Sequence, residues 1–318
     1  MSTRRTVLSA LSAGVLAAGG VVALGPAPAW AAESRPVGFA SLNGGTSGGS
    51  ASAVVTVTTA SALKSALSSG TSQTVRVSGL ISISGMYNVA SNKTVIGVGS
   101  GSGITGGGLN LSGVRNVILR NLVFRNAADD SINIQSGTTN VWVDHNDLSN
   151  GYDGLIDIKR GSDFITVSWN RLHNHDKSML LGHSDDNGSQ DIGKLRVTYV
   201  HNWFEGTGQR HPRVRFANPV HVLNNYYSNI GSYGVASTEN AGVFVERNYF
   251  ENVGKPTVTQ TGDSDPGNLK VLNNYRVNSG TEQVRNGASV AAIPYSYTPE
   301  ANNTVKATVQ AGAGTGRI

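Results

Sequence analysis

The most constraining feature of this chain is a short pattern that returns about every 24 residues. The pattern spans eight residues and reads aliphatic-x-aliphatic-x-x-Asn-x-bulky, where x is any residue. A unit this short cannot bury its own apolar face, so it must stack on its neighbours. We therefore expect a solenoid. Its anchoring asparagines, at spacings of 25, 24, 32, 23, 23 and 26, are Asn121, Asn146, Asn170, Asn202, Asn225, Asn248 and Asn274.

The residues around these asparagines predict strands rather than helices. The position three residues before each asparagine is mostly β-branched, which favours strands. No amphipathic helical segment separates the repeats, unlike in leucine-rich repeats, which argues against alternating strand–helix units and for a β-helix. Each asparagine is expected to adopt the left-handed conformation at a bend and to hydrogen-bond its equivalent in the next coil. The predicted fold is all-β, a right-handed parallel β-helix of about 23–25 residues per coil. The positions before the asparagines are Ile118, Val143, Val167, Tyr199, Val222, Val245 and Val271.

Three segments depart from the repeat. Residues 58–69 predict a short capping helix at the N-terminal end, with Leu63 and Leu67 on one face. The chain after about residue 280 is expected to pack along the outside. Between Asn170 and Asn202 lie about eight extra residues, and loops that protrude from a regular scaffold often carry function.

The first 31 residues are predicted to be a secretory signal peptide of the twin-arginine type. Arg4 and Arg5 precede an apolar run, and Ala29-Trp30-Ala31 resembles a cleavage site. A membrane anchor is the weaker alternative, because the run is near the minimum length for a span and rich in glycine and alanine. We expect a secreted, extracellular protein without a membrane partner, in which residues 32–318 form a single domain and remain monomeric.

Charge and cysteine content narrow the possible partners. Removing residues 1–31 takes away two arginines and no acidic residue, which lowers the formal net charge from +5 to +3. Such a mild charge permits an anionic partner without indicating nucleic acid. The absence of cysteine excludes disulfides and thiolate metal sites.

Acidic residues fall at equivalent places in neighbouring coils. Asp130 and Asp153 are 23 residues apart, one repeat, with Asp129 beside the first and Asp157 four residues after the second. Stacking would bring these carboxylates together, and their repulsion would be relieved by a hard divalent cation, most naturally Ca²⁺. The alternative is that they are turn residues on a solvated surface.

Basic residues follow one and two coils beyond the acidic ones. Lys177 lies in HDKSML, and Arg210, Arg213 and Arg215 lie in RHPRVRF. Most such residues are surface charges, but this order suggests a cleft for an anionic substrate bridged by a cation. Asp144-His145 is interpreted as structural, because Asp144 would lie on a different part of its coil.

Several of these segments resemble polysaccharide lyase family 1, the extracellular pectate lyases. They are SNKTVIGVGS, GITGGGLNLSGVRNVILRNLVF, VWVDH, DGLIDIKRGSDFITVSWN, HDKSMLLG and RHPRVRF, between about Pro36 and Asn274. The resemblance implies a right-handed parallel β-helix, Ca²⁺ and cleavage of polygalacturonate. The segment between VWVDH and DGLIDI is shorter than in several relatives, so a lower wall of the cleft is expected there.

Motif matching carries the family's site residues to this sequence. Asp130, Asp153 and Asp157 match the calcium ligands, and Asp129 is named beside them as a further ligand. Lys177 and Arg210 match the catalytic groups, and Lys177 and Arg215 match the substrate-binding groups.

The implied reaction is β-elimination, in which Arg210 removes the C5 proton of a galacturonate unit. Because arginine is normally protonated, this role requires an alkaline optimum. A pectin lyase would need no calcium, a polygalacturonase would use paired carboxylic acids, and a non-catalytic carbohydrate-binding β-helix would tolerate loss of Arg210.

Overall fold

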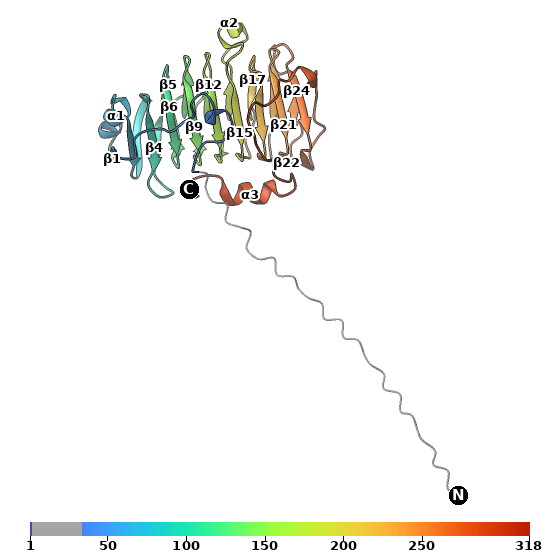
Figure 1. The fold of residues 1–318 in the computed structure, drawn as a ribbon, viewed down its shortest axis with the longest axis horizontal. Coiled ribbons are helices and arrows are strands. Elements are labelled where there is room, and N and C mark those ends of the chain that lie inside the picture. The colour runs from blue at the N-terminus through green and yellow to red at the C-terminus, as the bar shows by residue number, and fades with distance from the viewer. Residues whose placement is uncertain (2–33) are drawn as a thin grey trace. The chain divides into compact units, whose positions relative to one another are not determined.

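A computed structural model of the chain describes Met1 and residues 34–318. The predicted signal peptide, residues 1–31, therefore lies outside the described part apart from its first residue. Residues 34–318 wind into a parallel β-helix whose strands pair with the strands one coil before and one coil after (Figure 1). The predicted fold is confirmed. No helix among the described residues combines the length and apolarity needed to cross a bilayer.

The first face of the solenoid is a ten-stranded sheet. Its strands in spatial order are β1 (Val54–Val57), β2 (Gln73–Val77), β4 (Lys93–Gly97), β6 (Arg115–Arg120), β9 (Thr139–Asp144), β12 (Asp163–Ser168), β15 (Val197–Val200), β18 (Val220–Leu223), β21 (Gly242–Glu246) and β24 (Asn268–Leu272).

The other two faces diverge from one long strand, β5 (Gly103–Ser112), which pairs with β3 (Leu80–Asn88). The first half of β5 pairs with β7 and its second half with β8. The second face continues as β7 (Val123–Arg125), β10 (Asp147–Ser149), β13 (Arg171–His173), β16 (Trp203–Glu205), β19 (Tyr226–Ser228), β22 (Tyr249–Glu251) and β25 (Tyr275–Val277). The third face continues as β8 (Ile132–Gln135), β11 (Ile156–Ile158), β14 (Met179–Leu181), β17 (Arg213–Arg215), β20 (Val235–Thr238) and β23 (Thr257–Val258).

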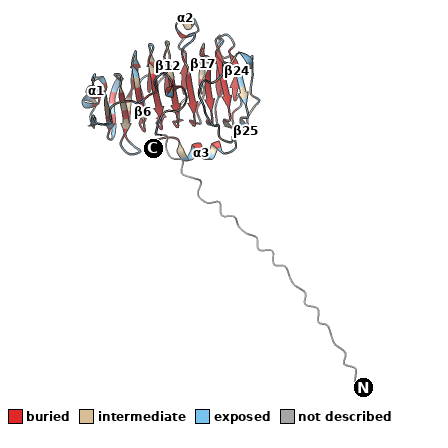
Figure 2. Cartoon of the chain, in the orientation of Figure 1, coloured by how far each residue is buried: buried red, intermediate tan, exposed pale blue. Residues whose placement is uncertain are grey.

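Alternation along each strand builds the core. On the first face one inward row runs from Val95 through Leu119, Val143 and Val167 to Tyr199, all of them fully buried. Burying a side chain of this size contributes roughly 1.5–3 kcal/mol, and each of these coils contributes one such residue. Figure 2 shows the strands in the middle of the solenoid as mostly buried. The inward position predicted for the first repeat was wrong by one residue, because Leu119 rather than Ile118 pairs with Val143 in this row.

The asparagine ladder is present at the bend between the first and second faces, but it begins one coil later than predicted. The side-chain amide of Asn146 donates to Asn170 at 2.9 Å, and the chain of such bonds continues to Asn274. Leu122, not Asn121, occupies the equivalent position in the preceding coil, where its N–H donates to Asn146. The expected left-handed conformation belongs to the residue before each ladder asparagine, such as His145 and Trp169.

The predictions for the N-terminal helix and the C-terminal segment are confirmed. Helix α1 (Ala60–Ser68) caps the N-terminal coils, with Leu63 and Leu67 fully buried. The C-terminal segment packs outside, where α3 (Val305–Gly312) lies against Tyr226 of the second face.

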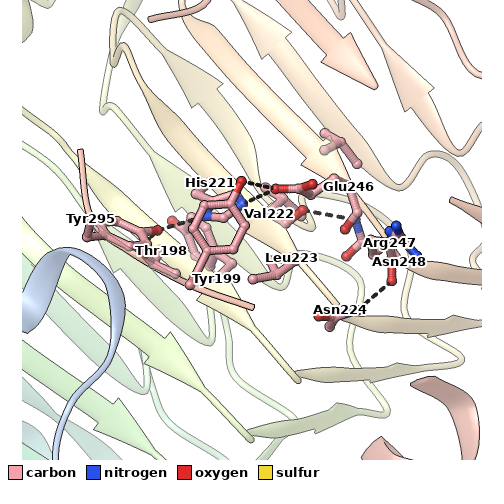
Figure 3. A network of polar contacts seen from close by, with 12 residues as sticks. Thr198, Tyr199, His221, Val222, Leu223, Asn224, Glu246, Arg247, Asn248 and Tyr295 are labelled. Carbon is pink, nitrogen blue, oxygen red and sulfur yellow. Dashed lines mark hydrogen bonds and ion pairs between the residues drawn. The ribbon is translucent and has the colours of Figure 1, made fainter. Parts of the chain in front are cut away.

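On the first face, the C-terminal segment is attached by a polar network (Figure 3). His221 is fully buried and forms hydrogen bonds through both ring nitrogens. Its Nδ1 lies 2.7 Å from the Tyr295 hydroxyl, and its Nε2 lies 2.8 Å from Oε1 of Glu246. The Tyr295 hydroxyl also lies 2.7 Å from that of Thr198. The tail is therefore fixed across two coils.

The long insertion lies after β14. It contains the one-turn helices η2 (Asp185–Asn187) and α2 (Gly188–Asp191), and α2 protrudes from the solenoid in Figure 1. The other short 3₁₀ helices of the described chain are η1 (Gly38–Ser41) and η3 (Gly287–Ser289). Lys177 precedes β14, so it lies at the opposite end of that strand from the protruding residues.

Candidate functional site

The predicted site residues all lie on the third face, in four consecutive coils. They are Asp129 and Asp130 before β8, Asp153 before β11, Asp157 within β11, Lys177 before β14, Arg210 before β17, and Arg215 at the end of β17. Ile156 and Ile158 point into the core, so alternation directs the Asp157 side chain outwards. Asp144 lies on the first face, in an ion pair with Arg120, away from these residues.

The carboxylates meet around Gly154. Oxygen atoms of Asp129, Asp130 and Asp153 lie within 4.8 Å of one another. A Cβ at Gly154 would lie 2.3 Å from Oδ1 of Asp157 and 2.9 Å from Oδ1 of Asp130. Only glycine leaves that space free, and the Gly154 N–H also donates to Asp130 Oδ1 at 2.9 Å.

Burial and like charge make this cluster electrostatically costly. Asp157 is 2% exposed; burial, followed by the charge of Asp130, raises its pKa to about 8. Burial also raises the pKa of Asp130, and the nearby Lys159 charge opposes that rise. Asp153 differs, because a hydrogen bond from Lys177 lowers its pKa. Asp130 and Asp157 are therefore both buried carboxylates, and the nearby positive charge of Lys159 among the described residues does not offset the electrostatic cost of their burial.

This donor set fits a hard cation. All candidate ligand atoms are carboxylate oxygens, which Ca²⁺ prefers. Asp129, Asp130 and Asp153 form the close group, and Asp157 lies outside that group but approaches Gly154 together with Asp130. A bound divalent ion would favour the charged form of both buried acids and relieve their repulsion. Asp129, Asp130, Asp153 and Asp157 could thus hold Ca²⁺.

Lys177 and Arg210 lie next to these carboxylates. Lys177 Nζ donates to Asp153 Oδ1 at 2.8 Å and is about one-third exposed. The Arg210 charge adds to the lowering of the Asp153 pKa that Lys177 causes, and it partly opposes the rise in the Asp157 pKa that burial causes, so its guanidinium is within electrostatic reach of both carboxylates. Its Nε is buried and has no hydrogen-bond acceptor among the described residues. A buried donor in this state lacks the hydrogen bond that would offset the cost of its burial.

The Arg210 backbone is held in an unusual conformation by its neighbours. Its φ is 64°, and its carbonyl accepts a 2.7 Å bond from the Met179 N–H. The next residue, His211, is fully buried, with its ring nitrogens 2.9 Å from the Tyr233 carbonyl and 2.7 Å from the Thr207 hydroxyl. Burial lowers the pKa of His211 to about 4, so the ring is a neutral anchor at pH 7.

Arg215 is more enclosed than a purely substrate-facing residue. It is 8% exposed, its Nε donates to Asp185 at 2.5 Å, and one terminal nitrogen donates to the Gly182 carbonyl at 3.1 Å. A Cβ at Gly182 would lie 2.6 Å from that of Arg215. Gly182 therefore leaves room for Arg215 in the outer row.

Three supporting residues were missed in the sequence. Lys159 pairs with Asp130 at 3.3 Å, and strand alternation from Asp157 could have placed it on this face. His175 contacts the Asp153 carbonyl at 2.7 Å. No repeat signal marks Asp185, because it lies in the insertion.

Comparison with known proteins is consistent across sequence and structure. A family model described as pectate lyase matches residues 5–318. A probable pectate lyase B of Aspergillus terreus is 40% identical over 276 residues, covering 83% of this chain and 84% of the relative. A pectate trisaccharide-lyase of Bacillus licheniformis is 37% identical over 300 residues, covering 88% and 86%. The crystal structure of a pectate lyase from Bacillus sp. N165 in complex with trigalacturonate superposes with a TM-score of 0.80 at 30% identity, covering 88% of this chain and 99% of that one.

Proposed function

Since the chain belongs to the pectate lyase family and is a polysaccharide lyase, we propose that it cleaves α-1,4-linked polygalacturonate by calcium-dependent β-elimination. The observation that carries this proposal is the position of Lys177 and Arg210 beside the carboxylates around Gly154. The trigalacturonate complex of the Bacillus sp. N165 enzyme supports the choice of substrate.

Asp130, Asp153 and Asp157 would hold Ca²⁺, with Asp129 as a further ligand. When bound, Ca²⁺ supplies Lewis-acid stabilisation of the negative charge that develops beside the substrate carboxylate. Lys177 donates hydrogen bonds to that same carboxylate, and a donor aimed at developing charge typically contributes roughly 3 kcal/mol. Arg215 binds a substrate carboxylate through the guanidinium N–H groups that Asp185 and Gly182 leave free.

Arg210, in its neutral form, removes the C5 proton of a galacturonate unit. The C5–H electron pair forms the C4–C5 double bond, the C4–O bond breaks, and the departing glycosidic oxygen takes a proton from water. Arg210 then returns its proton to solvent. The products are one chain with an unsaturated non-reducing end and one with a new reducing end. Arginine is ordinarily protonated, so this role predicts activity that rises into the alkaline range.

One assay tests the reaction. The purified protein is incubated with polygalacturonate, with Ca²⁺ or with chelator, and ultraviolet absorbance of the unsaturated product is followed. We expect absorbance to rise only with Ca²⁺. New reducing ends without absorbance would indicate hydrolysis, activity indifferent to chelator would indicate a pectin-lyase-like enzyme, and binding without products would indicate a carbohydrate-binding protein.

We also propose that residues 1–31 direct secretion and are removed, leaving 32–318 as the mature single-domain enzyme. N-terminal sequencing of protein recovered from culture medium tests this. The expected first residue is Ala32, and an intact Met1 on extracellular protein would refute cleavage.

A further inference from the structure

Strand β17 carries two arginines on its outer surface. Val214 is fully buried, so alternation directs Arg213 and Arg215 outwards on either side of it. Arg213 lies in the same outer row as Asp157, with only Leu180 of the intervening coil between them. Two strand spacings separate Asp157 from Arg213, which is about 10 Å along the solenoid.

One carboxylate and one hydroxyl hold both arginines. Asp185 accepts from Arg215 Nε at 2.5 Å, and the Ser264 hydroxyl lies 2.8 Å from each Asp185 oxygen. A terminal nitrogen of Arg213 donates to the same Ser264 hydroxyl at 2.7 Å and to the Thr261 carbonyl at 3.4 Å. Ser264 is 1% exposed, whereas the Asp185 side chain is exposed, so the bridge joins a buried hydroxyl of the 259–266 loop to a solvent-facing carboxylate of the insertion.

The local charge is not balanced by these contacts. Two guanidinium groups share one carboxylate, and Arg213 Nε is buried without a hydrogen-bond acceptor among the described residues. Burial, together with the charge of Arg215, lowers the pKa of Arg213. A purely structural bridge between two loops would need one arginine, and the second adds repulsion. An anionic ligand beside the two guanidinium groups would relieve that repulsion.

We propose that Arg213 and Arg215 together form a binding site for a uronate carboxylate further along the polymer than the residue being cleaved, with Ser264 and Asp185 as positioning residues. This inference rests on the proposed function, because it assumes a polyuronate lying along the third face. It adds Arg213, Ser264 and Asp185 to the substrate-binding machinery. It also assigns the long insertion a role, since Asp185 belongs to it.

The test compares Arg213→Gln with wild type on galacturonate oligomers of increasing length, from the trimer to the hexamer, and on the polymer. We expect the KM for the hexamer to rise about tenfold, the loss typical of one charge-assisted hydrogen bond. The rise for the trimer should be smaller, and kcat should stay within about twofold. Arg213→Lys should retain part of the affinity because it keeps the charge. Asp186→Asn is the matched control, an exposed acid in the same insertion with no side-chain contact to either arginine.

Ser264→Ala separates positioning from simple support. It should raise the hexamer KM in the wild-type background but raise it less in the Arg213→Gln background, because part of its effect acts through Arg213 and the rest through Asp185. An equal KM increase for trimer and hexamer, a loss confined to kcat, or additive effects of Ser264→Ala would overturn the inference. An unchanged hexamer KM in Arg213→Gln would also overturn it. If wild type lacks lyase activity on the polymer, the proposed function itself has failed.

Discussion

Replacing Asp157 with asparagine should stabilise the metal-free protein at alkaline pH and weaken its stabilisation by Ca²⁺. Because the native state holds the Asp157 proton up to about pH 8 while the unfolded state loses it near 4, the native state binds more protons between these values. Stability of the metal-free wild type therefore falls as pH rises through this window, by up to about 1.4 kcal/mol per pH unit. Asparagine cannot ionise, so the variant lacks this loss.

The expected difference is large enough to measure. Between pH 5 and pH 8 the wild type should lose about 4 kcal/mol relative to the variant, which corresponds to roughly 8 °C in Tm for a chain of this size. Calcium should act in the opposite direction. At a hundredfold excess over its Kd it should stabilise the wild type by about 2.7 kcal/mol, whereas the variant lacks one ligand and should gain less.

Thermal unfolding by circular dichroism at several pH values, with Ca²⁺ and with chelator, measures both effects, and calorimetric titration gives the calcium affinity. Asp186→Asn serves as the control because it removes an exposed carboxylate of the insertion. Parallel pH profiles for the metal-free wild type and Asp157→Asn would refute the electrostatic reasoning. An unchanged calcium affinity would remove Asp157 from the metal site.

Four further predictions concern the rest of the site. Lys177→Ala should lower kcat by roughly 100-fold while changing KM little, because its interaction strengthens as charge develops; steady-state kinetics would contradict this by showing a rise in KM alone. Arg210→Lys should bind substrate but turn over less than about 1% as fast, since the shorter ammonium sits wrongly relative to C5; substantial turnover with an unshifted pH profile would exclude Arg210 as the base. Gly154→Ala should weaken calcium binding at least tenfold, because its Cβ would lie 2.3 Å from Asp157 Oδ1 and displace that carboxylate, and calorimetry showing wild-type affinity would argue against a site beside Gly154. His211→Gln should flatten the acid limb of stability: the pKa of His211 is about 4 when folded and near 6.5 when unfolded, so the wild type loses up to about 1.4 kcal/mol per unit as pH falls between them, and an unchanged limb in thermal scans would count against the buried neutral ring.

The sequence alone determined the period, the strand content and the parallel stacking of this protein. Each coil must contribute one apolar residue, mostly a β-branched one, to the row that fills the interior. These residues therefore recur in the sequence about every 24 positions. The same regularity placed Asp130 and Asp153 in adjacent coils, because residues one period apart stack. It also contained enough information to find Lys159, which lies two residues after Asp157 and directly follows β11.

Only the tertiary structure decided the features that depend on distances across the repeat. The sequence pattern predicted Asn121 at the first ladder position, but Leu122 occupies it in the structure. The local pattern fits either residue at this bend, so it could not decide between them. How deeply Asp157 is buried depends on the side chains packed around it from other coils, which no local pattern encodes. The contact between Asp185 and Ser264 joins two loops 79 residues apart that lie outside the periodic pattern. Loops can meet in many ways at little cost in chain entropy, whereas stacked strands are held by their hydrogen bonds.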